Sequence, residues 1–206
     1  MNDQILYNDN YSRKVLNFDG NNTYKFRIRL KQLLKLSKFG KKEKVLEIGA
    51  NRGDLVKEMI KYSDDVIGVD FNADAVKLAG SDRIIFMNAE NLDFPNSYFD
   101  KIVSIHAIEH IPDIQKAINE MDRVLKNNGE AVLIYPLEPI RGIAAMRDAI
   151  LAYHDILKAR KLHIHKLTPK KIGTLISGTN LKIGNKGIYF EPFPCYFTVL
   201  KKVGFG

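Results

Sequence analysis

The stretch Lys44-Val45-Leu46-Glu47-Ile48-Gly49-Ala50-Asn51-Arg52-Gly53-Asp54-Leu55 decides the fold of this chain of 206 residues. A short apolar run is followed by a turn with two glycines, and then a helical pattern begins. This order predicts a strand, a tight loop and a helix. Such a loop brings backbone N–H groups and a helix N-terminus close to a bound ligand. The rest of the chain is interpreted as what surrounds this loop.

Strand and helix patterns alternate after the loop. The predicted strands cover residues 45–48, 65–70, 84–87, 101–105 and 130–135, and the predicted helices between them cover 54–62, 73–79 and 114–125. Strands that alternate with helices predict an α/β fold with a doubly wound, parallel sheet. In such sheets ligands bind at the carboxyl ends of the strands.

The segments on either side of this alternation have different patterns. Residues 24–39 predict a basic amphipathic helix that Gly40 ends, with Phe26, Leu30, Leu33 and Leu34 on its apolar face. Such a helix packs on its domain, lies on a membrane or grips nucleic acid, and we favour packing. After Pro136, residues 140–161 predict one or two helices. Thr168 and Pro169 then open a further helix to about residue 177, and two strand-like runs follow at 181–190 and 195–203.

Composition indicates one globular domain. The chain is 45% apolar, and no apolar run approaches the roughly 20 residues that a membrane span needs. The lone Cys195 excludes an internal disulfide and fits a reducing compartment. The first residues show no signal-peptide pattern. We therefore expect a soluble, cytoplasmic protein, and the oligomeric state stays open.

The net charge of +8 is unevenly distributed. Residues 1–44 have a net charge of +7, residues 45–135 of −7 and residues 136–206 of +8. Basic flanks around an acidic centre are consistent with an anionic partner, or with lysines that only keep the protein soluble.

Asp70 narrows the choice of ligand for the glycine loop. It ends the second predicted strand, 23 residues after Glu47. A carboxylate there can accept hydrogen bonds from both hydroxyls of a ribose. The dinucleotide fingerprint G-x-G-x-x-G is not met, because Asn51 and Asp54 stand where its second and third glycines would be. This weighs against NAD.

Five motifs in order then resemble one family, the class I S-adenosylmethionine-dependent methyltransferases of the type-11 subgroup, over about residues 43–136. The loop Glu47-x-Gly49-x-Asn51-x-Gly53 resembles the family's E/D-x-G-x-G-x-G. The others are Asn88-Ala89-Glu90-Asn91-Leu92-Asp93-Phe94, Phe99-Asp100-Lys101-Ile102-Val103-Ser104, Glu109-His110-Ile111 followed by Asp113, and Arg123-Val124-Leu125-Lys126-Asn127-Asn128-Gly129-Glu130.

The resemblance implies a Rossmann-like sheet of seven strands, mostly parallel, with a helical substrate cap after the fifth strand. It also implies one methyltransferase domain over residues 1–206. Its parts would be an arm and basic helix (1–43), a cofactor-binding core (44–136), a substrate-cap insertion (137–167) and a C-terminal helix with strands (168–206). The expected cofactor is S-adenosylmethionine, with S-adenosylhomocysteine as its product.

The resemblance also implies roles for single residues. Glu47 would hold the ammonium end of the cofactor, Asp70 the ribose, Phe71 the adenine face, and Asn88 the adenine amine. Asn51 replaces a glycine, and Asn tolerates left-handed backbone better than most residues. The full expected cofactor set is Glu47, Gly49, Ala50, Asn51, Gly53, Asp70, Phe71, Asn88, Ala89, Glu90 and His106.

The catalytic side is less determined. His106 is the candidate base, with His110 beside it, because histidine titrates near neutral pH; alternatively His106 only lines the methionine pocket. The grouping His106-x-x-Glu109-His110 is also similar to a metal site in some methyltransferases, but its first position differs, so we expect no metal. Substrate contacts are expected from the region after Pro136, at Arg141, Arg147, Tyr153, His163 and His165.

The sequence thus predicts methyl transfer to an oxygen, nitrogen or carbon of a small-molecule acceptor, anionic or sugar-like. One alternative is an RNA methyltransferase that uses the basic flanks. Another is a relative without catalysis that only binds the cofactor. The identity of the acceptor and of the methylated atom cannot be predicted from the sequence.

Overall fold

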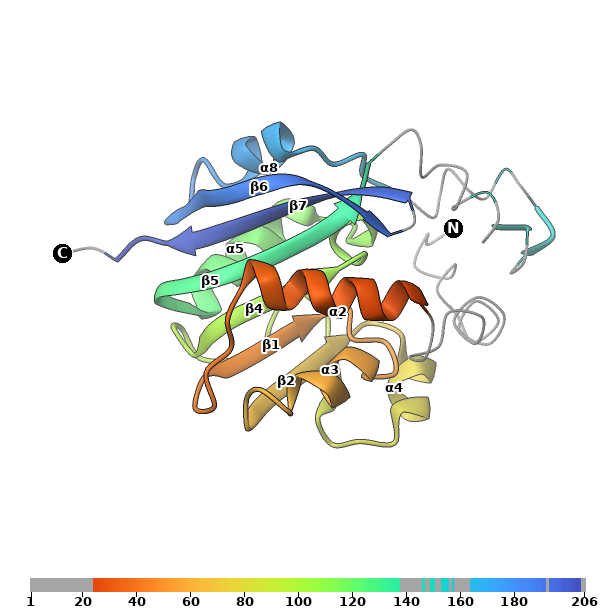
Figure 1. Ribbon diagram of the computed structural model, residues 1–206, viewed down its shortest axis with the longest axis horizontal. Coiled ribbons are helices and arrows are strands. Elements are labelled where there is room, and N and C mark those ends of the chain that lie inside the picture. Colours follow the sequence, from red (N-terminus) through yellow and green to blue (C-terminus); the bar gives the residue numbers. More distant parts are fainter. Residues whose placement is uncertain are drawn as a thin grey trace.

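The computed structural model describes residues 24–137, 146, 149–150, 153–155, 157, 164–191 and 193–204. Its sheet has seven strands in the order β3-β2-β1-β4-β5-β7-β6 (Figure 1). The first five are parallel, and β7 runs antiparallel to both β5 and β6. The predicted α/β fold with a mostly parallel sheet of seven strands is confirmed.

The element bounds follow the predicted alternation closely. The strands are β1 (Lys44–Ile48), β2 (Asp65–Asp70), β3 (Ile84–Phe86), β4 (Phe99–Ile105), β5 (Leu125–Pro136), β6 (Leu181–Glu191) and β7 (Phe193–Lys202). The helices are α2 (Tyr24–Leu36), α3 (Asp54–Met59), α4 (Ala73–Ala79), the 3-10 turn η3 (Ile108–His110), α5 (Ile114–Val124) and α8 (Pro169–Leu175).

Two apolar layers cover the two faces of the sheet. On one face, α2, α3 and α4 pack through residues such as Leu33, Val56 and Val76. On the other face, α5 and α8 pack through residues such as Ile118 and Ile172. The two-sided cover explains why the central strands are almost continuously apolar.

Helix α2 packs on the domain as expected, since Leu33 is fully buried and Phe26 and Leu30 are half-buried against the same core. Its predicted end at Gly40 is wrong. The helix stops at Leu36, and the hydroxyl of the buried Ser37 that follows donates to Glu130 Oε2 on β5 at 3.2 Å. Gly40 instead closes a short turn by donating its N–H to Glu43 Oε2 at 2.7 Å.

The predicted gap between α5 and the fifth strand is also absent. β5 begins at Leu125, which pairs with Phe99, and the pairing then shifts so that Glu130 lies opposite Lys101. Asn128 takes up the shift with a left-handed φ of 63°. Consequently β4 also begins two residues before the predicted start.

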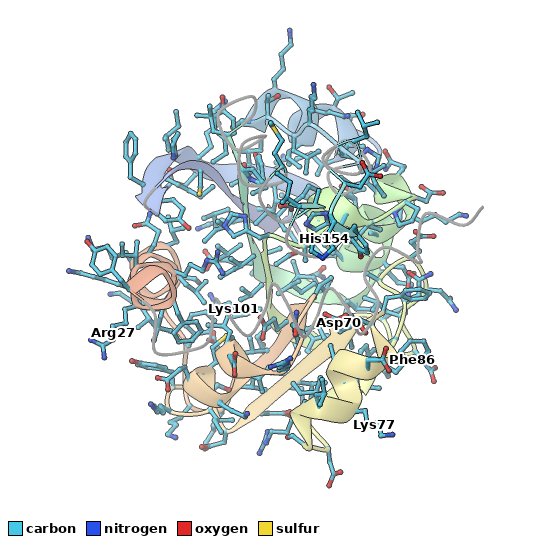
Figure 2. All side chains as sticks on the ribbon, turned by 90° about the vertical axis from the view of Figure 1, so that its right-hand side faces the viewer. Arg27, Asp70, Lys77, Phe86, Lys101 and His154 are labelled. Atoms are coloured by element: carbon cyan, nitrogen blue, oxygen red, sulfur yellow. The ribbon has the colours of Figure 1, made fainter. Side chains whose placement is uncertain are left out.

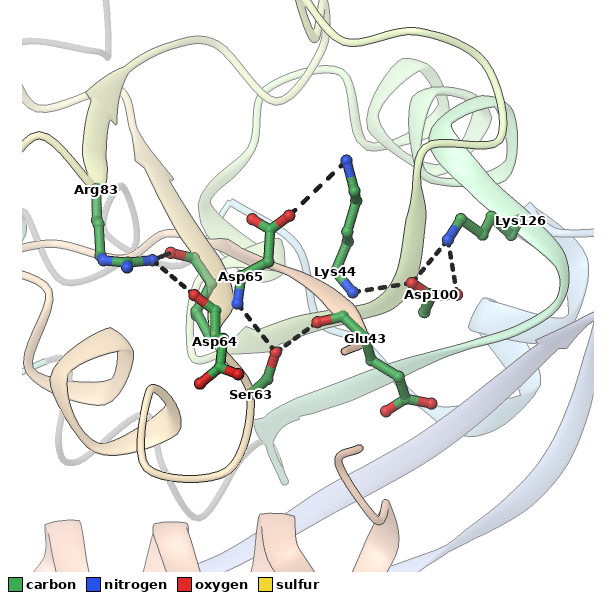
Figure 3. Close-up of polar contacts among 9 residues, drawn as sticks. Glu43, Lys44, Ser63, Asp64, Asp65, Arg83, Asp100 and Lys126 are labelled. Atoms are coloured by element: carbon green, nitrogen blue, oxygen red, sulfur yellow. Dashed lines mark hydrogen bonds and ion pairs between the residues drawn. The ribbon is translucent and has the colours of Figure 1, made fainter. Parts of the chain in front are cut away.

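Polar side chains join the amino ends of the strands, at the end opposite to the candidate site (Figure 3). Asp100 accepts from the Lys44 N–H at 2.8 Å and from Lys126 Nζ at 2.8 Å. The Ser63 hydroxyl donates to the Glu43 carbonyl. These contacts tie β1, β2, β4 and β5 together at their amino ends.

In the described segments, no helix has the length and apolar content needed to cross a membrane.

Candidate active site

The loop between β1 and α3 has an unusual backbone. Gly49, Asn51 and Gly53 have left-handed φ angles of 80°, 51° and 74°. Left-handed backbone strains most residues, whereas glycine and asparagine tolerate it. The loop also leaves no space for a side chain, since a Cβ on Gly49 would lie 2.1 Å from the Cβ of Ala107. The loop therefore abuts the turn that follows β4.

Asp70, at the carboxyl end of β2, holds this loop in place. Its Oδ2 accepts the N–H of Asn51 at 2.7 Å, and its Oδ1 accepts the N–H of Asn72 at 2.8 Å. Burial raises the pKa of Asp70, and these two N–H bonds oppose that rise. Figure 2 looks onto this end of the sheet and shows Asp70 near its centre. Each carboxylate oxygen retains a lone pair for a ligand.

Glu47, on β1, is a second perturbed acid of the site. Its side chain is buried, and its Oε2 has no hydrogen-bond partner in the described part of the chain. Burial, with the nearby charges of Asp70 and Asp54, raises the pKa of Glu47 from 4.5 to about 8. A buried carboxyl without a partner costs free energy unless a donor or cation reaches it. The surroundings of Glu47 Oε2 therefore suit a positively charged group of a ligand.

The loop after β3 completes one side of the site. The Met87 N–H donates to the Asp70 carbonyl at 3.0 Å, so this loop begins beside Asp70. Asn88 Oδ1 accepts the Glu90 N–H at 2.9 Å, which leaves one lone pair of that oxygen for a ligand. The carboxylate of Glu90 accepts the Asp113 N–H at 3.0 Å and so holds the start of α5.

Two aromatic rings lie exposed next to Asp70. Phe71 follows Asp70 directly in the sequence, and Phe86 on β3 pairs with Asp70 across the sheet. The ring centroids are 5.6 Å apart and the rings are tilted by 34°. The sequence analysis predicted Phe71 as a ligand contact but did not predict Phe86. The alternation of side chains along β3 from Ile84 did not indicate that the Phe86 side chain is exposed. Exposed aromatic faces of this kind suit a planar ligand.

A brace from α5 holds the loop after β3. The Arg123 guanidinium donates to the carbonyls of Leu92 and Phe94, both at 2.7 Å, and pairs with Glu120 at 2.8 Å. Glu120 Oε2 in turn accepts the Leu92 N–H at 2.7 Å. Arg123 belongs to one of the sequence motifs, but no sequence pattern indicated that its guanidinium donates to two backbone carbonyls.

Replacing Arg123 by Lys should raise the KM for the ligand that binds at the loop after β3 by about tenfold, and kcat should change less. Lysine cannot hold two carbonyls and Glu120 in one fork. Steady-state kinetics of the variant, beside Lys116→Gln on the exposed face of α5 as control, measures the effect. A lower melting temperature with an unchanged KM would limit Arg123 to a structural role.

Three predicted side chains meet after β4. His106 has a left-handed φ of 53°, and its N–H donates to the Ile134 carbonyl at 2.8 Å. Oε1 of the buried Glu109 lies 3.7 Å from His106 Nδ1 and 3.8 Å from His110 Nε2. The opposite ring nitrogen of His106 lies 4.0 Å from the Cys195 thiol. The carboxylate therefore lies between two imidazoles, within ion-pair distance of both.

Cys195 was missed as a site residue. It reaches His106 because β7 pairs antiparallel with β5, which places Cys195 opposite Pro136. A register between strands some 60 residues apart leaves no signal in a single sequence. As for metal, the described residues contain no group of three His, Cys, Asp or Glu side chains arranged to hold an ion.

The expected substrate residues fall into two groups. Arg141, Arg147 and His163 lie outside the described residues. Tyr153 is half-buried, and burial raises its pKa to about 12. Figure 1 shows the short described stretches between residues 146 and 157 beyond the carboxyl ends of the strands, where a substrate would enter.

His165 is fixed against the turn after η3. Its N–H donates to the Glu109 carbonyl at 3.0 Å, and its ring Nε2 lies 2.9 Å from the Ile111 carbonyl and 3.2 Å from that of Pro112. Carbonyls only accept, so Nε2 carries the proton. The strand-like stretch expected around His165 is absent, because residues 164–168 form no strand. Its backbone bonds to the turn instead of to a neighbouring strand.

Comparison with known proteins matches residues 46–133 to a family model described as "Methyltransferase domain". The uncharacterized methyltransferase YcgJ of Bacillus subtilis is 32% identical over 111 residues, which cover 50% of this chain and 44% of that protein. The chloroplastic 2-methyl-6-phytyl-1,4-hydroquinone methyltransferase of Spinacia oleracea is 39% identical over 103 residues, 46% of this chain and 30% of that protein. The chain thus spans less than two thirds of these relatives.

Among solved structures, that of YcgJ superposes with a TM-score of 0.67 at 18% identity, and the match covers 87% of this chain and 100% of that one. At this identity the likeness concerns the fold alone.

Proposed function

We propose that this chain, which carries a class I methyltransferase domain of the type-11 kind, transfers a methyl group from S-adenosylmethionine to a small-molecule acceptor. The observation that carries the proposal is the buried carboxyl of Glu47. Its buried Oε2, which has no hydrogen-bond partner in the described residues, lies near Asp70 and the left-handed loop and fits the ammonium group of that cofactor. When bound, the cofactor supplies a methyl group that its sulfonium has already activated.

The loop and the residues around it would each contact a different part of the cofactor. Glu47 would accept from the ammonium, and the backbone of Gly49–Gly53 would lie along the methionine part. Asp70 would offer its free lone pairs to the two ribose hydroxyls. Phe71 and Phe86 would cover the adenine, and Asn88 and Ala89 would contact its edge. The core of 44–136 would thus hold the cofactor, and 137–167 the acceptor.

The imidazoles after β4 would act on the acceptor. His106 Nδ1 lies 3.7 Å from the Glu109 carboxylate, so we propose that Nδ1 keeps its proton there and that Nε2 takes a proton from the acceptor. An acceptor group would have to take the place of the Cys195 thiol next to Nε2. His110 shares the same carboxylate and would assist by holding Glu109 in position.

We propose that the acceptor is small and anionic or sugar-like. The basic composition of residues 136–206 supports this, because they include residues 137–167, which would hold the acceptor. Spinach hydroquinone methyltransferase, by its name, acts on a small molecule, which is consistent with an acceptor of this size.

Incubation with labelled S-adenosylmethionine tests the reaction. We expect label in the small-molecule fraction of a cell extract, and none in total RNA added separately. Label that enters only RNA would overturn the small-molecule acceptor. If no methyl group is transferred but S-adenosylmethionine still binds, the domain only binds the cofactor and does not catalyse the reaction.

Glu47 should make cofactor binding depend on pH. With a pKa of about 8, roughly nine tenths of this carboxyl are protonated at pH 7 in the free protein. A bound ammonium favours the carboxylate, so binding at pH 7 should release roughly one proton. Calorimetry in buffers of different ionisation enthalpy measures that release. Affinity should rise with pH toward 8, and it should fall at higher pH, where the ligand's own ammonium loses its proton.

The variant Glu47→Gln supplies the control, since it removes the titrating group and should bind without proton release. The stability of the free protein follows the opposite trend. A carboxyl whose pKa is raised on folding stabilises below its unfolded pKa, and that contribution is lost as pH rises through about 8. Equal proton release by wild type and variant would contradict the role of Glu47.

A further inference from the structure

His165 bonds to the turn after β4 through both its backbone and its ring. Its N–H donates to the Glu109 carbonyl at 3.0 Å. Its ring Nε2, which carries the proton, lies 2.9 Å from the Ile111 carbonyl and 3.2 Å from the Pro112 carbonyl. A single residue of the proposed substrate cap therefore bonds to three carbonyls of this turn.

The two ends of the same turn contact the loops of the proposed cofactor site. At its start, Ala107 lies so close to the glycine loop that a Cβ on Gly49 would be 2.1 Å from the Ala107 Cβ. At its end, the Asp113 N–H donates to the carboxylate of Glu90, on the loop after β3, at 3.0 Å. The turn thus connects both cofactor loops with the substrate cap, and His165 makes the connection to the cap.

The position of this turn matters because of the side chains that it carries. Glu109 is buried, and its Oε1 lies 3.7 Å from His106 Nδ1 and 3.8 Å from His110 Nε2. The residue whose carbonyl accepts from His165 is therefore the one whose carboxylate faces the proposed base. A misplacement of about 1 Å in such a group can lower a reaction rate by about a hundredfold.

The segment around His165 is also anchored by contacts that do not involve the imidazole. Leu167 is 2% exposed and belongs to the same buried cluster as Ile108 of η3. The Thr168 hydroxyl then accepts the Lys171 N–H at 3.2 Å and caps α8. The segment should therefore stay folded when the ring loses its N–H, so the contribution of the ring can be measured separately.

We propose that His165 is a positioning residue for methyl transfer. Its ring ties the substrate cap to the carbonyls of Ile111 and Pro112. This tie holds Glu109 and His106 in place against the acceptor. His165 thus acts on the reaction through the turn and not by contact with the acceptor, and its role in catalysis rests on the proposed function.

The variants His165→Phe and His165→Gln test the proposal. Phenylalanine keeps a ring but has no N–H, whereas glutamine keeps an N–H donor near the end of its side chain. Transfer is measured with labelled S-adenosylmethionine and a dilution series of the small-molecule fraction of a cell extract. H165F should lower the maximal rate about tenfold, and H165Q should stay within about twofold of the wild type.

Two binding measurements separate positioning from direct contact. The amount of extract that gives half the maximal rate should change by less than about twofold in H165F, because the ring is not a substrate contact. The dissociation constant of S-adenosylmethionine should also change by less than about twofold, since both cofactor loops keep their contacts with the turn.

Hydrogen exchange gives a measurement that needs no methyl transfer. Amides of residues 106–113 should exchange about tenfold faster in H165F than in the wild type, and H165Q should restore their protection. Lys170→Gln, which changes an exposed side chain on α8, is the matched control and should equal the wild type in rate and exchange.

A wild-type maximal rate in H165F, or equal losses in H165F and H165Q, would refute the positioning role. A higher half-saturating amount of extract at an unchanged maximal rate would refute it too, because that result assigns His165 to substrate contact. If the wild type transfers no methyl group, the proposed function fails, and faster exchange in H165F alone would still support the tie between cap and turn.

Discussion

Replacing Gly49 by Ala should abolish S-adenosylmethionine binding and lower the free energy of unfolding by about 3 kcal/mol. Two effects add. A residue with a side chain is strained at φ 80°, and its Cβ would lie 2.1 Å from the Cβ of Ala107. The loop would have to move away from the turn after β4, so its N–H groups would leave the ligand. Urea unfolding and calorimetric titration measure the two losses.

Gly80→Ala is the matched control for this prediction. Gly80 is also left-handed, at φ 56°, but a Cβ there meets nothing within 4 Å. Its replacement should therefore cost only about 1 kcal/mol and leave cofactor binding unchanged. Similar stability and similar cofactor affinity of the two variants would show that the close approach of Gly49 to Ala107 matters neither for folding nor for binding.

Replacing Asp70 by Ala should weaken S-adenosylmethionine binding by more than a hundredfold. The side chain now accepts two backbone N–H groups, at 2.7 and 2.8 Å, and its remaining lone pairs are proposed to accept the ribose hydroxyls. Hydrogen bonds to a charged group contribute about 1.5 to 3 kcal/mol each, so losing the ribose pair alone reaches this size. The loop would also lose its tie at Asn51.

Calorimetry compares this variant with Asp74→Ala, an exposed carboxylate in the first turn of α4. The control removes a nearby negative charge without touching the loop, and its affinity should stay within twofold of the wild type. Wild-type affinity in Asp70→Ala would contradict both the loop contact and the ribose contact as sources of binding energy.

Local patterns predicted the parts of the fold that local forces decide. β2 and α4 have the predicted bounds, since each is delimited by its own apolar run and by the Asn72 cap. Thr168 caps α8 as predicted, through its hydroxyl and the Lys171 N–H. Glu47 and Asp70 meet at the same sheet edge because parallel strands share their carboxyl ends.

Contacts between distant elements decided the features that the sequence did not reveal. The residue after α2, Ser37, bonds to Glu130, and β5 begins early because Leu125 pairs with Phe99. The neighbourhood of His106 and Cys195 depends on the antiparallel register of β7. Such partners lie tens of residues apart, so no periodicity within one segment encodes them.

A crystal structure with S-adenosylhomocysteine tests the central claim most directly. The predicted result places the ligand's ammonium within hydrogen-bond reach of Glu47 Oε2, its ribose hydroxyls on Asp70, and its adenine against Phe71 and Phe86. A ligand bound elsewhere, with Glu47 Oε2 still buried and without a partner, would contradict the account.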